Sequence, residues 1–313
     1  MEKIGEARND VAASLLSHQL QGVTLFFLGD VTTARSHLEQ SHGLGDPVYR
    51  AACAAFVEQD PHVTNLAHLA IALIYLGYID LGRARMNEAL SEARGLRHAH
   101  TLAWVLNFTC EAAWALNLPR EAYRSADEIL ALSNEHGFPF WLAWGSLYRG
   151  WSMAALGNAS EGLAVLTKGL SIHRAAGAEV STPQALMLLD EAYAQLEQPV
   201  ERLNCLAEAG QIIERTQERY NETELHRLRG DLLNTTGDQA AAEQSYHHAV
   251  EVAKRQRTKL WELRAATSLA RLWREQGKRT EAHDLLAPVY GWFAQGFDTP
   301  VLQDAKALLD QLA

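Results

Sequence analysis

Cysteine and proline are both scarce in this chain of 313 residues, which contains only 3 cysteines and 8 prolines. Cys53, Cys110 and Cys205 lie far apart, and their odd number and their spacing fit neither a disulfide framework nor a zinc motif. We therefore predict that they are reduced thiols, as in cytosolic proteins. No Pro/Gly/Ser-rich linker or low-complexity tract interrupts the chain, so residues 1–313 are predicted to form one continuous domain.

Positive charge is also deficient, because 28 lysines and arginines stand against 38 aspartates and glutamates, which gives a formal net charge of −10. An acidic chain repels phosphate backbones, so this composition argues against a nucleic-acid partner. The basic run Lys254, Arg255, Arg257 and Lys259 is a local exception. We interpret it as a solvated helix end or loop.

Long apolar stretches are missing as well. The longest runs from Leu66 to Tyr78 and is too short to span a bilayer, which requires about 20 residues. Residues 1–6 have no apolar signal-peptide core. The sequence therefore predicts a cytoplasmic protein that does not bind membranes.

Motifs for catalysis and cofactor binding are absent from the sequence. It contains no Gly-x4-Gly-Lys-Ser/Thr phosphate loop, no Gly-x-Gly-x-x-Gly turn and no Gly-x-Ser-x-Gly nucleophile elbow. The closest histidine pairs, His98 with His100 and His247 with His248, lack the His-Glu-x-x-His spacing, and zinc requires three or four ligands. We predict that the chain is not an enzyme and uses no metal or other cofactor.

What the sequence does contain is an internal repeat. A small residue is followed by a turn residue and two further small residues, most clearly at Gly230, Gly237, Ala242 and Ala249. The turn position recurs at 29, 77, 117, 157, 197, 237 and 277, a spacing of 48 followed by spacings of 40. A turn residue with positive φ ends one helix, and small residues let the next helix approach closely. The repeat predicts an all-α, right-handed α-α superhelical solenoid of about seven helix-turn-helix units.

Two segments depart from the 40-residue period. The longer first spacing places extra residues around 43–61, which predicts either a small insertion or an extended helix. Residues 301–312 have an amphipathic pattern, with leucines at 302, 308, 309 and 312 and polar residues between them. This segment is predicted to be a C-terminal capping helix that solvates the end of the solenoid.

The repeat motif resembles the tetratricopeptide repeat, although the period is longer than the usual 34 residues. A narrower resemblance is to the C-terminal repeat region of large bacterial signalling ATPases and adenylate or guanylate cyclase fusions. It is carried by residues 59–61, 140–144, 261–266, 268–273, 276–279, 285–293 and 296–299. This resemblance implies a docking or sensing module without ATPase or cyclase activity. Whether the chain stands alone or is part of a larger protein is open at this stage.

The resemblance also implies where a partner binds, because the first helix of each tetratricopeptide repeat lines the concave face. Transferred to this chain, the candidate groove residues are Trp104, Asn107, Glu111, Trp114, Trp144, Leu147, Trp151, Glu191, Arg227, Asp231 and Arg271. The tryptophans could anchor an apolar peptide side chain, and the arginines could hold a carboxylate. In the alternative interpretation, the tryptophans belong to the core and the charged residues are solvated or paired with one another.

Three functions are compatible with these observations. The favoured one is a non-catalytic peptide- or protein-binding module for docking or sensing in bacterial signal transduction, which predicts an open concave groove. The second is a small-molecule sensor, which predicts a closed pocket near Trp104 to Trp151. The third is a scaffold that self-associates through the first repeat, which predicts a large apolar patch over Leu15 to Phe27.

Overall fold

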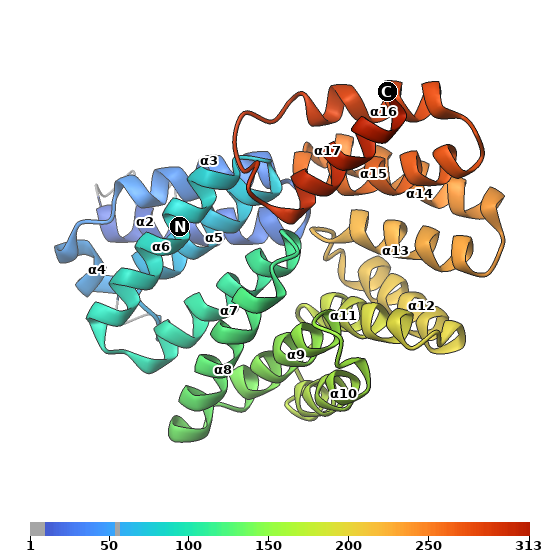
Figure 1. Ribbon diagram of the computed structural model, residues 1–313. Helices are drawn as coiled ribbons and strands as arrows, with labels where there is room; N and C mark the ends of the chain where they lie inside the picture. Colours follow the sequence, from blue (N-terminus) through green and yellow to red (C-terminus); the bar gives the residue numbers. More distant parts are fainter. Residues whose placement is uncertain (1–9, 54–56) are drawn as a thin grey trace.

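The computed structural model describes residues 10–53 and 57–313 (Figure 1). These residues form 16 α-helices and no strand, and all but two of the helices form seven consecutive pairs. The pairs are α2 (Val11–Phe27) with α3 (Val31–Gly43), α5 (Pro61–Tyr75) with α6 (Ile79–Leu96), α7 (Ala99–Ala115) with α8 (Pro119–His136), α9 (Pro139–Ala155) with α10 (Ala159–Ala175), α11 (Thr182–Gln195) with α12 (Pro199–Thr216), α13 (Glu222–Thr235) with α14 (Gln239–Gln256), and α15 (Lys259–Glu275) with α16 (Arg279–Tyr290). The two remaining helices are α4 (Pro47–Cys53) and the capping helix α17 (Pro300–Leu312). The predicted all-α solenoid of about seven repeats with a C-terminal cap is confirmed.

The turn inside each pair has the backbone conformation that the repeat motif requires. All seven turn positions have positive φ, from 55° at Glu197 to 99° at Gly157. Five of them are glycines, which adopt this conformation without steric cost. Asn117 and Glu197 adopt it despite their side chains, so the packing of the two flanking helices fixes the turn at these positions.

Small residues of the motif set the distance between paired helices, as α9 and α10 illustrate. A Cβ atom added to Gly150 would lie 2.6 Å from the carbonyl oxygen of Gly162. A Cβ atom added to Gly162 would lie 2.5 Å from the carbonyl oxygen of Gly150. The backbones of the two helices can approach this closely only because neither residue has a side chain.

The short helix α4 accounts for the longer first spacing, so the extra residues form a small insertion. Cys53 of α4 forms a buried cluster with Leu15 and Leu16 of α2. At the other end of α2, Phe26 packs against Tyr220, with ring centroids 5.2 Å apart. The large apolar patch expected along α2 is therefore not exposed, because the insertion covers one end of the helix and the sixth repeat covers the other.

The superhelix closes on itself, and Figure 1 shows the N-terminal repeats lying beside the C-terminal helices. The side-chain oxygen of Gln295 accepts hydrogen bonds from the backbone N–H groups of Asp80 (3.1 Å) and Leu81 (3.3 Å). Arg83 forms a salt bridge of 2.8 Å with Asp298. The loop between α16 and α17 thereby joins the end of the chain to the second repeat.

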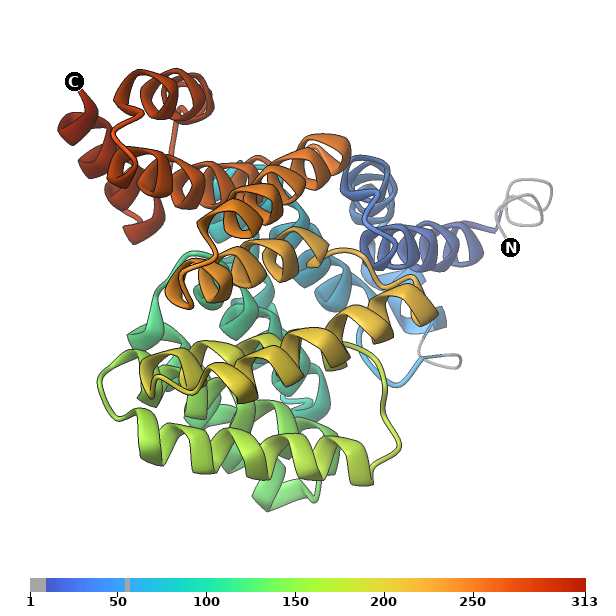
Figure 2. The same cartoon turned by 90° about the vertical axis from the view of Figure 1, so that its right-hand side faces the viewer.

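A second set of contacts joins the first repeat to the sixth. The backbone N–H of Arg219 donates to the carbonyl oxygen of Phe27 at 2.7 Å. The side chain of Gln256 lies directly against Gly29, and Figure 2 shows α2 and α3 close to the end of α14. We call these two sets of contacts the seam. Because the seam is closed, the concave surface of the solenoid faces the inside of a ring.

Candidate functional site

Four of the predicted groove residues lie on the inner wall of the closed ring. Trp114 (1% exposed), Trp144 and Trp151 (2% each) and Leu147 (0%) are all buried. The indole of Trp114 packs against Trp261 of α15, with ring centroids 5.6 Å apart. These side chains therefore do not line an open groove, contrary to the sequence-based expectation. Helix α15 lies against Trp114 across the closed ring, whereas the Trp144 ring packs against His173 of its own partner helix α10.

Trp104 and Asn107 lie nearer the surface than the other residues predicted on α7. Both side chains are partly buried, and the Trp104 ring packs against Trp141 at 5.5 Å between centroids. Within the described residues, the indole nitrogen of Trp104 and the side-chain oxygen of Asn107 are buried and have no hydrogen-bond partner. The structure does not bring these two residues together with the charged candidates.

Glu191 of α11 connects two of the buried tryptophans. Its Oε1 accepts a hydrogen bond from the Nε1–H of Trp114 (2.8 Å), and its Oε2 accepts one from the Nε1–H of Trp151 (2.8 Å). One carboxylate thereby joins α7, α9 and α11, and three of the predicted residues meet at one point. Hydrogen bonds to a charged acceptor are stronger than those between neutral groups, so Glu191 fixes the relative position of these helices.

Glu111 takes part in a second buried polar contact that crosses the inside of the ring. The Tyr75 hydroxyl oxygen lies 2.8 Å from Oε1 of Glu111 and 3.1 Å from the side-chain oxygen of Asn221. Burial raises the pKa of Glu111 to about 8, and the nearby carboxylate of Glu218 adds to the increase, whereas the Tyr75 hydrogen bond lowers it. A protonated Glu111 can donate to the Tyr75 oxygen while Tyr75 donates to Asn221, so the neutral acid satisfies this network.

The charged candidates are paired with one another or with neighbouring residues. Arg227 binds Glu224 in three hydrogen bonds of 2.9–3.0 Å and Asp231 at 2.5 Å. Arg264 of α15 also binds Glu224, at 3.0 Å, and donates to the carbonyl oxygen of Ala115 at 3.0 Å. Burial alone would raise the pKa of Glu224, but the two guanidinium groups beside it lower the pKa below its usual value.

These charged residues lie around a hollow on the concave side, a pocket of about 440 Å³ between α11, α13, α15 and α17. We call it the polar concave pocket. Its lining residues are Asn117, Glu191, Arg227, Arg264, Thr267, Ser268, Arg271, Pro300, Val301 and Asp304. Three predicted candidates, Glu191, Arg227 and Arg271, therefore meet in one pocket, and Asp231 contacts its wall through Arg227.

Sequence analysis missed the contribution of the capping helix to this pocket. Asp304 of α17 forms a salt bridge with Arg271 of α15, and both side chains are largely exposed. Asp304 was assigned only to the solvated face of the cap, because the repeat motif carries no information about α17. Arg264, by contrast, occupies a concave position in the repeat register of the seventh unit, so the register does identify it as facing the concave side.

The structure offers no alternative metal or thiol site within residues 10–53 and 57–313. No group of three or more His, Cys, Asp or Glu side chains in these ranges could hold a metal ion. Cys53, Cys110 and Cys205 are buried and form no disulfide with one another. No helix in the described part of the chain is long and apolar enough to cross a membrane.

Comparison with known proteins places this architecture in a structural class. No protein-family model and no curated protein matches the sequence. Among solved structures, the chain is similar to a Rap protein complexed with competence and sporulation factor, with a TM-score of 0.64 and 13% identity over 96% of this chain and 87% of that one. It is also similar to the apo form of RapI, with a TM-score of 0.56 and 12% identity over 95% of this chain and 99% of that one.

A third similar structure belongs to a signalling protein. It is the signal transduction ATPase with numerous domains from Pyrococcus horikoshii, which has a tetratricopeptide-repeat sensor. The TM-score is 0.52 and the identity 14%, over 97% of this chain and 49% of that protein. Together with the seven helix pairs, these similarities show that the chain has the tetratricopeptide-repeat fold, as the sequence motif indicated.

Proposed function

We propose that this chain is a non-catalytic module that binds a peptide or a peptide segment of a protein in the polar concave pocket. One observation carries the proposal: residues at concave positions of three repeats, together with residues of the capping helix, line a single solvent-accessible hollow. The Rap structure with a TM-score of 0.64, which is complexed with competence and sporulation factor, supports a ligand-binding role for a solenoid of this shape.

The lining of the pocket indicates which peptide groups it would recognise. Arg227 and Arg264 are held by the buried carboxylate of Glu224, so they are fixed in position. Arg271 is different, because it forms its salt bridge with Asp304 near the surface, where their side chains are 41% and 55% exposed. Exposed salt bridges contribute little stability, so a ligand carboxylate can displace Asp304 at small cost. We infer that Arg271 binds an acidic side chain or a C-terminal carboxylate of the peptide.

Residues of the polar concave pocket contact the buried tryptophans. Ligand binding in the pocket can therefore be transmitted to the inner wall and can be measured by tryptophan emission. Glu191 lines the pocket and also accepts hydrogen bonds from Trp114 and Trp151. The guanidinium of Arg264 lies 5.3 Å from the ring centroid of Trp261. A ligand that moves Glu191 or Arg264 would change the environment of these indoles and, through them, the packing of the inner wall.

The wider role that we propose is docking or sensing in bacterial signal transduction, in the cytoplasm. The sequence resemblance to signalling ATPases and the structural similarity to a tetratricopeptide-repeat sensor support this role. Free, buried cysteines are in keeping with a reducing compartment. Small-molecule sensing and self-association are the alternatives, and the following experiment separates them.

The test is affinity selection from a synthetic heptapeptide library with free C-terminal carboxylates, in parallel with the same library as C-terminal amides. We expect selected peptides to shift the tryptophan emission. Arg271→Ala should weaken their binding about tenfold or more, since a hydrogen bond to a charged group contributes about 1.5–3 kcal/mol. Arg274→Ala is the matched control, because Arg274 lies on the same helix and is hydrogen-bonded to Gln311 outside the pocket.

Three results would contradict the proposal. Equal losses in Arg271→Ala and Arg274→Ala would mean that the peptide binds elsewhere. Failure of both libraries, combined with an emission shift caused by a small metabolite, would favour the sensor. Failure of both libraries, combined with concentration-dependent association in sedimentation, would favour the scaffold.

A further inference from the structure

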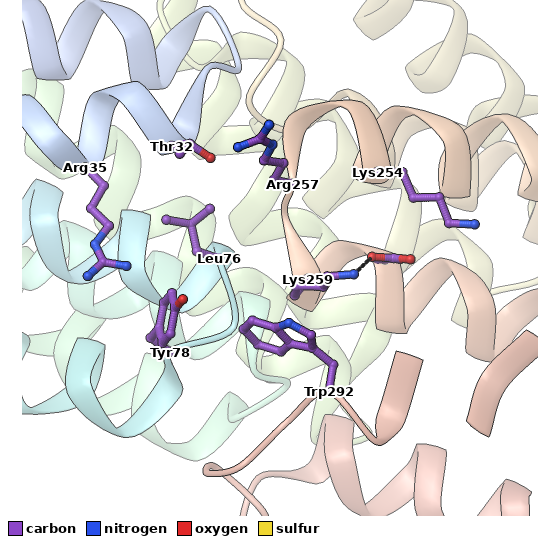
Figure 3. Close-up of a pocket in the computed structure, with 9 residues that line it drawn as sticks. Thr32, Arg35, Leu76, Tyr78, Lys254, Arg257, Lys259 and Trp292 are labelled. Carbon is purple, nitrogen blue, oxygen red and sulfur yellow. Dashed lines mark hydrogen bonds and ion pairs between the residues drawn. The ribbon is translucent and has the colours of Figure 1, made fainter. Parts of the chain in front are cut away.

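A second hollow, distinct from the polar concave pocket, lies on the seam where the ends of the ring meet (Figure 3). It has a volume of about 350 Å³, within the range of small-molecule sites. Figure 3 shows Arg35 and Tyr78 of the N-terminal repeats on one side, Arg257 and Trp292 of the C-terminal repeats on the other, and Leu76 between them. We call it the seam pocket.

The seam pocket is strongly cationic in a chain whose net charge is −10. Its lining includes Arg35, Lys254, Arg257 and Lys259, but only one carboxylate, that of Glu262. Glu262 is already bound to Lys259 at 2.6 Å, and Arg35 forms a salt bridge of 2.8 Å with Glu39, which is not part of the lining. Among the described residues, Lys254 and Arg257 are therefore the lining cations without a carboxylate partner. Clustered cations of this kind create a local positive potential, which attracts anions even to an acidic protein.

Arg257 is one of two lining cations, with Lys254, whose charge is not paired with a carboxylate among the described residues. Its side chain is exposed and forms no hydrogen bond or salt bridge within the described residues. It also lines an adjoining hollow of about 450 Å³, together with Arg219 and Arg255. Arg219 and Arg255 are both paired with Glu222, so Arg257 is the unpaired arginine that the two hollows share.

Two aromatic side chains form the floor beside these cations. The rings of Tyr78 and Trp292 meet edge to face with centroids 5.6 Å apart, and Trp292 remains 39% exposed. Arg35 lies over the Tyr78 ring at 4.8 Å. Because Tyr78 precedes α6 and Trp292 follows α16, this floor exists only while the ring is closed.

We propose that the seam pocket binds a small polyanion that carries phosphate groups and that the bound anion holds the ring closed. Guanidinium groups bind phosphate through paired hydrogen bonds, and several cations can share one polyphosphate. Arg35 lies on the N-terminal side of the seam, where it also pairs with Glu39 at 2.8 Å, and Lys254 and Arg257 lie on the C-terminal side. A bound anion contacts residues from both sides of the seam at once. The anion therefore binds the closed ring more tightly than an open one, and this difference in affinity stabilises the closed ring.

The experiment measures binding of inorganic pyrophosphate and of ATP to the full chain by isothermal titration calorimetry. Thermal unfolding is recorded with and without each probe. Arg257→Glu reverses the central charge at an exposed position, so the variant is expected to fold. Arg97→Glu is the matched control, since Arg97 is also exposed, follows a second helix of a pair and has a φ of 53°, against 59° for Arg257.

We expect pyrophosphate to bind the wild type and to raise its unfolding temperature. Arg257→Glu should weaken binding at least tenfold and abolish the thermal shift, while Arg97→Glu should match the wild type. Tighter binding of ATP than of pyrophosphate, lost in Trp292→Ala, would identify a nucleotide as the ligand. Equal binding of the two would identify the polyphosphate alone, and both results support the site.

The proposal is overturned if neither probe binds at millimolar concentration in 150 mM salt. It is also overturned if Arg257→Glu and Arg97→Glu lose affinity equally, because binding would then reflect general surface charge. If binding occurs without a thermal shift, the anion does not hold the ring closed. None of these results bears on the polar concave pocket, whose residues are not altered.

Discussion

Replacing Glu111 by glutamine should change how the stability of the ring depends on pH. The Glu111 side chain is buried, its pKa is raised to about 8, and its nearest partner is the Tyr75 hydroxyl at 2.8 Å. Glutamine has nearly the same shape, retains an acceptor oxygen and brings an amide donor for Tyr75, but it does not ionise. The substitution therefore removes the titration of this position while preserving most of its packing.

The sign and the size of the effect follow from the two pKa values. Because the folded-state pKa is raised, the neutral carboxyl favours the folded ring, and this stability is complete below the unfolded value of 4.5. It is lost as the pH rises from 4.5 to about 8. Since one pKa unit corresponds to about 1.4 kcal/mol, the wild type should lose on the order of 5 kcal/mol relative to Glu111→Gln across this window.

The measurement is urea-induced unfolding, followed by circular dichroism, at intervals from pH 5 to pH 9. Burial also raises the pKa of Glu218, to about 7, so Glu218 contributes a slope of its own. For that reason the comparison is repeated in a Glu218→Gln background, where Glu111 is the main titrating group of this cluster. A stability difference between wild type and Glu111→Gln that stays constant from pH 5 to pH 9 would refute the reasoning.

Two further substitutions test the packing of the ring. Glu191→Ala should destabilise the chain by about 2–5 kcal/mol in urea unfolding, because two buried indole N–H groups lose their acceptor, whereas Glu191→Gln should cost less. Gly150→Ala should cost about 1–3 kcal/mol because its Cβ would contact the backbone of α10, while Gly95→Ala on α6, where a Cβ meets open space, should stabilise by about 0.5–1 kcal/mol. Equal effects of the two glycine substitutions would contradict the role assigned to small residues in helix pairing.

The repeat architecture could be predicted because it depends on local chemistry. A turn residue with positive φ and small residues at fixed offsets are needed in every unit, so each unit repeats the same signal. Even the weak copies, at Asn117 and Glu197, have the expected backbone conformation. The insertion was detected from the spacing of 48, but its form as the short helix α4 depends on its packing against α2 and could not be predicted from a period.

The identity of the pocket residues could be predicted only in part, because the register gives the direction of a side chain and not what lies opposite it. Glu191, Arg227 and Arg271 do face the concave pocket, as their register positions indicate. Trp114 and Trp151 have equivalent positions, yet they are buried, since Glu191 and α15 lie against them. The register shows neither partner, since α15 reaches Trp114 across the closed ring and Glu191 binds both indoles from α11.

Ring closure itself has no signature in the repeat, because its contacts join residues that no single unit contains. The Tyr75–Asn221 and Arg83–Asp298 contacts span 146 and 215 positions of sequence, respectively. The loop that carries Asp298 follows α16, outside the repeat register, so motif analysis assigns it no function. The entropy cost of joining two chain ends grows only slowly with the number of residues between them. Here the rigid repeats already restrict the positions of the two ends, so closing the ring costs little further entropy. The seam contacts therefore join ends that the repeats have already brought close, and we expect a ligand that bridges the seam pocket to stabilise this closed arrangement further.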